Sequence, residues 1–253
     1  MKSAIKKYAV IVAAGSGQRA GGGLPKQFHD LAGLPMLWHS VRAFRSAAPD
    51  TNVILVLSEE GMEIWNGIAE TLPLEDRVFN RESVRIVKGG KTRTESVSNA
   101  LALIKSENRS EVAGGSASES GIDDSLQFLV AIHDAARPMI SERVIQDGWS
   151  VALKSGAAVP VVPVTDSIRI LDGEGGSSAV DRSVYVSVQT PQVFDGALLI
   201  SAYSAMSPER VYTDDASVVE EYHPITLYDG DPTNFKVTVP HDFMVAESMF
   251  CER

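Results

Sequence analysis

Five short, nearly continuous apolar runs constrain the fold of this chain more than any other feature. They are rich in valine and isoleucine, as is typical of strands covered on both faces of a parallel sheet. Patterns of apolar residues with helical spacing stand between them. The runs are residues 8–14, 52–58, 83–90, 128–135 and 157–164. Because strand and helix alternate, the sequence predicts an α/β fold, a mostly parallel sheet flanked by helices.

Three of the helical patterns have clear starting points. One follows Pro35, one follows Thr92 and one follows Ser141. Proline is favoured in the first turn of a helix, and serine and threonine are favoured at the N-cap. These residues therefore predict where three helices of the α/β alternation begin.

Two segments interrupt the alternation. Residues 106–125 are polar, rich in small side chains and aperiodic, which predicts a flexible surface loop. Residues 167–188 form two alternating runs around a Gly/Ser turn, which predicts a hairpin within a β-arm at about 165–188. Such an arm needs a surface to pack on, often that of a second subunit. We expect the remainder of residues 1–253 to form one domain around this sheet.

Composition excludes several classes of function. The formal net charge is −10, from 23 basic and 33 acidic residues, which argues against binding to nucleic acid or to anionic membranes. Cys251 is the sole cysteine of the sequence, so neither an intramolecular disulfide nor a cysteine-based zinc site is expected. No run approaches the roughly 18 apolar residues of a membrane helix, and we expect a cytoplasmic protein.

The string AAGSGQRAGGGLPKQF at residues 13–28 predicts a ligand site directly after the first strand. In open α/β sheets, ligands bind beyond the carboxyl ends of the strands. Gly15 and Gly17 let backbone N–H groups approach phosphate oxygens. Arg19 and Lys26 add two cations whose spacing suits a triphosphate better than a single phosphate.

Two well-known phosphate loops do not fit this string. A dinucleotide fingerprint requires G-x-G-x-x-G, but the third glycine is Gly21, one position late. A Walker loop requires Gly-Lys-Ser/Thr, but Lys26 follows a proline and precedes a glutamine. The remaining interpretation is nucleotidyl transfer.

The string resembles the signature of nucleotidyltransferases, and specifically that of the 2-C-methyl-D-erythritol 4-phosphate cytidylyltransferase family. Seven further motifs agree in order along nearly the whole chain. They are GGKTRTESV (89–97), HDAARP (133–138), PVTDS (163–167), VDRS (180–183), QTPQVF (189–194), TDDAS (213–217) and GDPTNFKVTVPHD (230–242). The resemblance implies a Rossmann-like nucleotidyltransferase fold, transfer of a cytidylyl group from CTP to a polyol phosphate, a requirement for Mg²⁺, and a homodimer that exchanges its β-arms.

The resemblance also implies roles for individual residues. Arg19 and Lys26 would stabilise the triphosphate and the transition state, and Lys236 would align the acceptor phosphate with the α-phosphate. Arg182, on the arm, would reach the neighbouring subunit's site and hold the acceptor phosphate. Base binding would fall to Ala13, Ala14, Gly90 and Ser96, and further acceptor contacts to Arg137, Ser167, Thr190 and Thr213.

The metal site is expected where the strand of residues 128–135 ends. Asp134 follows this buried strand, and a carboxylate there suits Mg²⁺, which takes one or two carboxylates plus substrate phosphates. Asp134 would contact nucleotide, acceptor and metal, with Asp231 as its partner ligand. An alternative for Asp231 is an ordinary turn residue before Pro232. His133 is interpreted as structural, because a phosphate nucleophile needs no base near neutral pH.

Two alternatives remain open from the sequence. A ribitol 5-phosphate cytidylyltransferase shares the loop and several of the motifs, and its acceptor is also a small polyol phosphate. A catalytically silent nucleotide-binding regulator on the same fold would lack some of the cations, yet Arg19, Lys26, Arg182 and Lys236 are all present.

Overall fold

The centre of the molecule is a sheet of eight strands with the order β10-β7-β11-β6-β1-β4-β5 and with β12 paired to β7. The computed structural model describes residues 5–15, 23–108, 127–207 and 209–251. The strands are β1 (Lys6–Val12), β4 (Asn52–Leu57), β5 (Val84–Lys88), β6 (Phe128–Asp134), β7 (Ala157–Pro163), β10 (Val186–Val188), β11 (Gln192–Asp195) and β12 (Thr226–Asp229).

The five strands predicted from the apolar runs are confirmed as β1, β4, β5, β6 and β7. Four of them, β6, β1, β4 and β5, form a continuous parallel block. The strand β11 runs antiparallel between β6 and β7, so the sheet is mixed while its core is parallel, as predicted. Because β1 and β6 are parallel and in register from Lys6 with Phe128 to Val12 with Asp134, their carboxyl ends meet at one edge.

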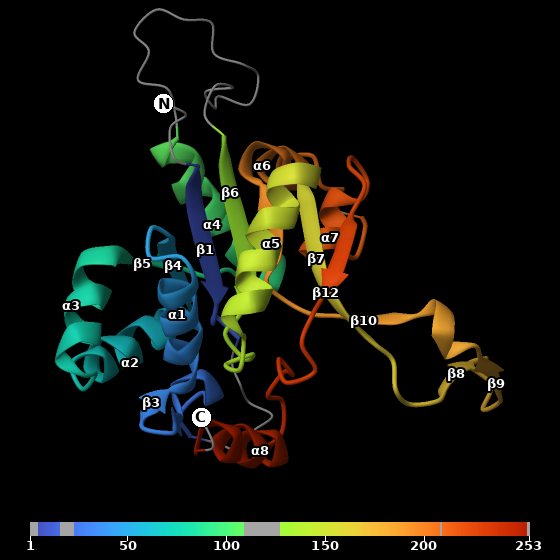
Figure 1. Cartoon of the computed structure of the whole chain (residues 1–253), viewed down its shortest axis with the longest axis horizontal. Helices are drawn as coiled ribbons and strands as arrows, with labels where there is room; N and C mark the ends of the chain where they lie inside the picture. Colours follow the sequence, from blue (N-terminus) through green and yellow to red (C-terminus); the bar gives the residue numbers. More distant parts are fainter. Residues whose placement is uncertain (1–4, 16–22, 109–126, 208, 252–253) are drawn as a thin grey trace, which may run out of the picture.

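Helices cover both faces of the sheet (Figure 1). The three predicted helices are confirmed as α1, α4 and α5. Thr92 caps α4 by accepting the Glu95 N–H, whereas Ser141 occupies the N-cap of α5 without a side-chain cap hydrogen bond. The helices are α1 (Met36–Ala47), α2 (Glu59–Ala69), α3 (Leu74–Ser83), α4 (Arg93–Glu107), α5 (Glu142–Ser155), α6 (Gly196–Ser204), α7 (Asp215–Val219) and α8 (Pro240–Cys251), with the short 3₁₀ helices η2 (Lys26–Phe28) and η3 (Arg182–Val184).

Alternating side chains of β1 divide the core into two layers. Ala9 and Ile11 pack with aromatic residues of α1, α2 and α5, whereas Tyr8 and Val10 pack with α4 and α6 on the opposite face. This two-sided burial explains why the strand sequences are apolar throughout. A smaller cluster packs α8 against Leu31 of β2 (Asp30–Leu31), which pairs with β3 (Leu34–Pro35), and Ala246 is fully buried in it.

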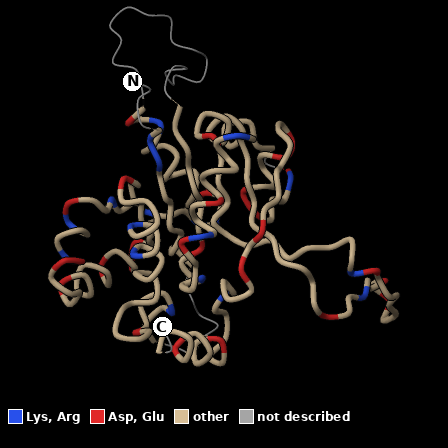
Figure 2. The backbone as a smooth tube through the Cα atoms, viewed as in Figure 1, with Lys and Arg blue, Asp and Glu red and all other residues tan. Residues whose placement is uncertain are grey.

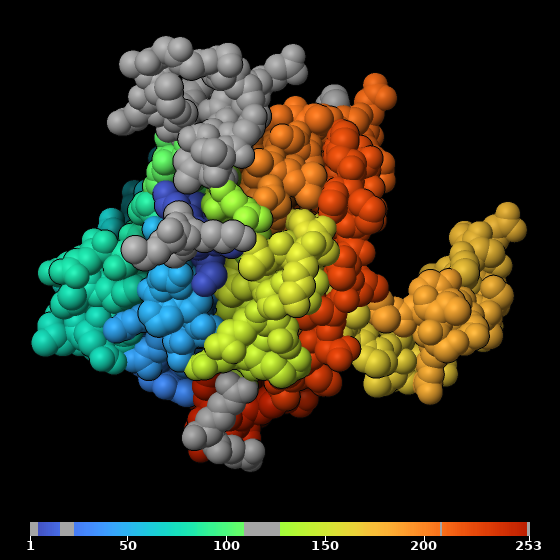
Figure 3. Space-filling view, turned by 45° about the horizontal axis from the view of Figure 1, so that its top comes forward, coloured from blue at the N-terminus to red at the C-terminus, as the bar shows by residue number. Residues whose placement is uncertain are grey.

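The β-arm leaves the body of the molecule as an extended projection (Figures 1 and 3). Its hairpin consists of β8 (Ile168–Leu171) and β9 (Ser177–Val180), which pair antiparallel. The chain then turns through η3 and returns as β10, which pairs with β7 in the main sheet. The hairpin is therefore shorter than the expected run of 167–188, because the last residues of that run extend the central sheet.

Acidic and basic residues are intermixed along both the body and the arm (Figure 2). No described helix combines the length and the apolar character needed to cross a membrane. Of the loop expected at residues 106–125, positions 109–125 lie outside the described residues.

Candidate active site

A pocket of about 860 Å³ lies at the edge where β1 and β6 end. Its lining comes from five segments: the end of β1 with the residues after it, the start of η2, the start of α4 with the residues before it, the end of β6 with the residues after it, and the segment before α8. Eight of the predicted site residues line it. They are Ala13, Ala14, Gly15, Lys26, Gly90, Ser96, Asp134 and Lys236.

Close backbone packing shapes the side of the pocket at Gly89 and Gly90. A Cβ at Gly89 would lie 2.4 Å from the Cβ of Ala14, and one at Gly90 would lie 2.3 Å from the Cβ of Glu95. The Gly90 N–H donates to the Ser96 hydroxyl at 3.1 Å. Residues with a side chain would push these segments apart, so the glycines keep this side narrow.

Side-chain hydrogen bonds hold the two described ends of the glycine string together and tie the string to a distant segment. The side-chain amide of Gln27 donates to the carbonyl oxygens of Ala13 and Gly15, at 2.9 and 3.0 Å. The ammonium group of Lys26 donates to the carbonyl of Val237 at 2.7 Å. Lys26 is therefore joined to the segment that carries Lys236. Gly17 and Arg19, predicted for the same string, lie outside the described residues.

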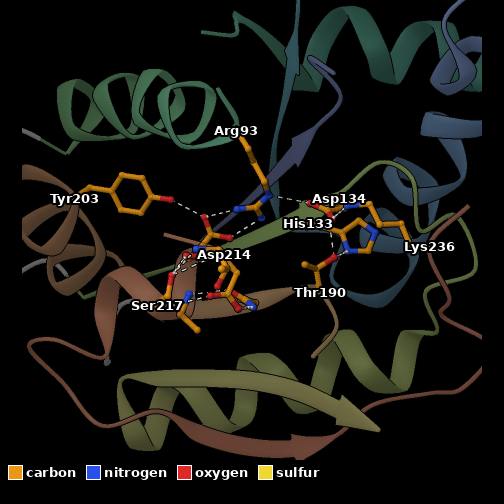
Figure 4. A network of polar contacts seen from close by, with 12 residues as sticks. Arg93, His133, Asp134, Thr190, Tyr203, Asp214, Ser217 and Lys236 are labelled. Atoms are coloured by element: carbon orange, nitrogen blue, oxygen red, sulfur yellow. Dashed lines mark hydrogen bonds and ion pairs between the residues drawn. The ribbon is translucent and has the colours of Figure 1, made fainter. Parts of the chain in front are cut away.

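Asp134 lines the pocket, and its carboxylate lies between Arg93 and Lys236 (Figure 4). Its Oδ1 accepts from Nε of Arg93 at 3.1 Å, and its Oδ2 accepts from Nζ of Lys236 at 2.7 Å. Burial by itself would raise the pKa of Asp134, but the cations of Arg93 and Lys236 outweigh it and hold the pKa well below its usual range. The carboxylate is therefore ionised at neutral pH.

His133 is fully buried directly behind Asp134. Burial lowers its pKa to about 4, so the imidazole is neutral. Its Nε2 lies 3.2 Å from the carbonyl of Arg137, and its Nδ1 lies 3.1 Å from the hydroxyl of Thr190, which also accepts the backbone N–H of Asp134. Both ring nitrogens contact protein groups, so His133 helps to hold Asp134 in place, in agreement with a structural role.

Two predicted acceptor contacts lie beside the pocket and not on its lining. Thr190 is only 5% exposed, and its hydroxyl accepts the backbone N–H of Asp134. Arg137 donates from Nη1 to the carbonyl of Asn234 at 2.8 Å, so it holds the loop before Lys236. Their predicted contacts with the acceptor remain predictions.

Three further residues predicted to contact the acceptor are exposed, and none of them is among the residues that line the pocket of the same chain. Ser167 is at the root of the arm, and Thr213 precedes α7. Arg182, in η3 on the arm, donates to the carbonyl of Thr165. Their placement leaves the predicted roles untested within a single chain.

Asp231 occupies a turn before Lys236. Its Oδ1 accepts the backbone N–H of Thr233 at 2.9 Å and the Thr233 hydroxyl at 2.7 Å, the arrangement expected of a turn aspartate. Asp231 is not among the residues that line the pocket. Within the described part of the chain, no group of three or more His, Cys, Asp and Glu side chains is arranged to hold a metal. The pairing of Asp134 with Asp231 as metal ligands stays a prediction.

The sequence did not lead us to predict a role for Arg93, although this residue stands within the GGKTRTESV motif. Arg93 is the first residue of α4, lines the pocket, and bonds to both Asp134 and Asp215. The carboxylates of Asp215 and Asp134 overcome the opposing effect of burial and raise the pKa of Arg93, so its charge is permanent. An arginine inside GGKTRTESV was a visible signal, but its partners are 41 and 122 positions away.

Comparisons with known proteins agree with the motifs and with the fold. The sequence matches the family described as IspD: 2-C-methyl-D-erythritol 4-phosphate cytidylyltransferase over residues 7–113 and 110–252. A protein of that name from Bacteroides fragilis is 38% identical over 245 residues, covering 96% of this chain and 99% of the relative. One from Azobacteroides pseudotrichonymphae is 35% identical over 246 residues, covering 96% and 98%.

A solved structure supports the same assignment. The crystal structure of 2-C-methyl-D-erythritol 4-phosphate cytidylyltransferase from Thermus thermophilus superposes with a TM-score of 0.67 at 29% identity, and the match covers 97% of this chain and 98% of that one. The predicted nucleotidyltransferase fold is therefore confirmed. With agreement over nearly the full length of sequence and structure, this chain belongs to the IspD family of 2-C-methyl-D-erythritol 4-phosphate cytidylyltransferases.

Proposed function

We propose that this chain transfers the cytidylyl group of CTP to 2-C-methyl-D-erythritol 4-phosphate, giving 4-diphosphocytidyl-2-C-methyl-D-erythritol and pyrophosphate, a step in the supply of isoprenoid precursors. The observation that carries the proposal is the pocket of this family member, which combines Lys26, Lys236 and Arg93 with glycine-rich backbone at the carboxyl edge of the sheet. None of the relatives named above favours a ribitol phosphate acceptor.

The reaction is an in-line displacement at the α-phosphorus of CTP. An oxygen of the acceptor phosphate forms a bond to this phosphorus, and the bond from the α-phosphorus to the oxygen that bridges to the β-phosphate breaks, so that pyrophosphate leaves. Nucleophile and target are both anionic, so fixed cations lower the barrier by neutralising charge and by positioning the two groups. Lys26 and Lys236 supply two of these cations from the pocket wall, and Arg19 is proposed as a third.

The donor set of the pocket fits a magnesium ion. Mg²⁺ binds through one or two carboxylates plus substrate phosphates, and Asp134 presents an ionised carboxylate at the place where the triphosphate is proposed to lie. We propose Asp134 as the protein ligand, with Asp231 as a second candidate. When bound, the ion would neutralise phosphate charge during the transfer. Arg93 and Lys236, which both bond to Asp134, keep this carboxylate ionised and oriented.

The activity is tested by following pyrophosphate release from pure protein with Mg²⁺, each of the four nucleoside triphosphates, and either methylerythritol phosphate or ribitol 5-phosphate. We expect product from CTP with methylerythritol phosphate alone. Product from ribitol 5-phosphate would identify the alternative enzyme. Silence with every pair would contradict the proposal and support a non-catalytic regulator.

The β-arm is proposed to join two copies of the chain into a homodimer. The hairpin, η3 and the returning strand β10 together expose six large apolar side chains, an unusual density for a segment that faces water. They are Ile170, Leu171, Val184, Tyr185, Val186 and Val188. A second subunit would cover them and would bring Arg182 to the pocket of its partner, which explains why Arg182 lies away from the pocket of its own chain. A cytoplasmic location and a lack of nucleic-acid binding are proposed on composition alone.

Mixing two inactive variants tests this sharing of the site. Arg182→Ala and Lys236→Ala should each be nearly inactive, whereas an equal mixture, allowed to exchange subunits, should regain about a quarter of wild-type activity, because half of the dimers are mixed and each mixed dimer holds one intact site. Activity is measured as pyrophosphate release, and the oligomeric state by light scattering. A monomer at working concentration, or no recovery despite exchange, would contradict the shared site.

A further inference from the structure

An ion pair joins the wall of the pocket to the protein interior, because Arg93 lines the pocket and its partner Asp215 does not. Asp215, in α7, is fully buried, and its two oxygens accept from the two terminal nitrogens of Arg93, Nη1 to Oδ1 at 3.0 Å and Nη2 to Oδ2 at 2.7 Å. The hydroxyl of Tyr203, in α6, donates to Oδ1 of Asp215 at 2.6 Å. Figure 4 shows Tyr203 and Arg93 pointing toward the same carboxylate.

The ion pair continues into the pocket through the remaining nitrogen of the same guanidinium. Nε of Arg93 donates to Asp134, and the other oxygen of Asp134 accepts from Lys236. A bidentate pair fixes the plane of a guanidinium as well as its position. With both terminal nitrogens held by Asp215, the Nε edge is directed at Asp134. Lys236 is therefore linked, through two carboxylates and one arginine, to side chains of α6 and α7.

Stability alone is a poor explanation for this arrangement. A buried ion pair gains little net free energy of folding, because the loss of hydration of both charges offsets their attraction. Orientation is a stronger explanation, since transfer between two phosphates depends on cations held in place before the substrates arrive. Lys236 stands at the end of this chain of contacts and at the pocket.

We propose that Asp215 and Tyr203 are positioning residues for the transfer reaction: Tyr203 orients Asp215, Asp215 orients Arg93, and Arg93 holds Asp134 in the position that aligns Lys236. The inference rests on the proposed function. Neither Asp215 nor Tyr203 lines the pocket, so both act through Arg93 and not by contact with a substrate.

Asp215→Asn and Tyr203→Phe test the inference with minimal change of shape. Asp215→Asn should lower kcat about 100-fold, the effect of misplacing catalytic groups by an ångström or so. Tyr203→Phe should lower kcat about 5-fold, the effect of one hydrogen bond. The KM for CTP should stay within about 3-fold of wild type, because Gly90 and Ser96, which are proposed to bind the base, bond to each other and the substitutions leave that contact intact. The double variant should be little worse than Asp215→Asn alone, because Tyr203 acts through Asp215.

Matched controls separate positioning from stability. Asp76 is a second buried carboxylate paired with arginines, at 2.5 Å from Arg42 and 3.6 Å from Arg45, and none of the three lines the pocket. Asp76→Asn should lower Tm but leave kcat unchanged at temperatures below the transition. Tyr222→Phe removes a hydroxyl that donates to the carbonyl of Ala205 and should also leave kcat unchanged. Equal kcat losses in Asp215→Asn and Asp76→Asn would contradict the inference, as would a wild-type kcat in Asp215→Asn.

A readout independent of turnover keeps the inference distinct from the proposed function. In NMR spectra of the arginine side chains, Arg93 of the wild type should give separate Nη signals, because Asp215 hinders rotation of the guanidinium. These signals should merge in Asp215→Asn. Their line widths should also change in Tyr203→Phe, so the second variant tests the inference if the first fails to fold. Unchanged Nη signals in both variants would overturn the inference. An inactive wild-type protein with separate signals would contradict only the proposed function.

Discussion

Lys26→Ala should lower kcat at least 100-fold while the protein remains folded. Lys26 lines the pocket at the start of η2, where its ammonium is proposed to stabilise the charge that develops on the triphosphate. Loss of such a contact in the transition state costs about 3 kcal/mol, which corresponds to the expected change in rate. The hydrogen bond to the Val237 carbonyl that is also lost contributes about 1 kcal/mol to stability.

The variant is assayed by pyrophosphate release, with Tm measured in parallel. Lys88→Ala is a suitable control, because Lys88 is an exposed lysine whose Nζ pairs with Glu59 at 2.7 Å on the surface. Surface pairs of this kind contribute little to stability, so the control should retain both activity and Tm. Near-normal turnover in Lys26→Ala would remove this residue from the mechanism.

Lys236→Ala should also lower kcat at least 100-fold, for two reasons that act together. The variant loses the cation proposed to align acceptor and α-phosphate, and among the described side chains Asp134 keeps Arg93 as its partner. The Oδ2 atom of Asp134 then loses its contact with Nζ of Lys236, so the carboxylate is held less firmly in the position that the reaction requires. Single-turnover measurements with CTP and methylerythritol phosphate check the chemical step directly.

The matched control for this second lysine is Lys154→Ala, on the exposed face of α5. It should behave as wild type in kcat, KM and Tm. Lys236→Arg keeps a positive charge but not the compact geometry of an ammonium, so we expect it to recover only part of the lost rate. Full activity in Lys236→Ala would contradict the alignment of acceptor and α-phosphate that is proposed for this lysine.

The parallel core of the fold was predictable because its physical cause is local. Strands covered on both faces have apolar side chains on both faces, and that pattern stands out in the sequence of β1 or β4. The strands β11 and β12 were missed, since each has four residues and takes its place by pairing with β7 and not through a pattern of its own. The expected hairpin was too long for a similar reason, because its last residues form β10, which pairs with β7.

The position of a candidate site residue was predictable where a motif places it at the end of a strand, as with Asp134, the last residue of β6. The role of a residue was not predictable where it depends on contacts with residues that are distant in the sequence. Nothing near Arg93 in the sequence reveals Asp215, because an ion pair over 122 positions depends on how α4 and α7 pack. The same limit applies to Arg182, whose predicted role depends on a second chain.

The contact between Lys26 and Val237 joins positions 211 residues apart, so the pocket takes one wall from each end of the chain. During synthesis the β1, β4, β5 and β6 block emerges long before residues 236–238, and domains generally fold as they leave the ribosome. A nascent chain halted before Lys236 would thus hold the residues of every strand of the sheet yet lack the side of the pocket that Lys236 and Thr238 line. Completion of the pocket is therefore a later event in synthesis than completion of the sheet.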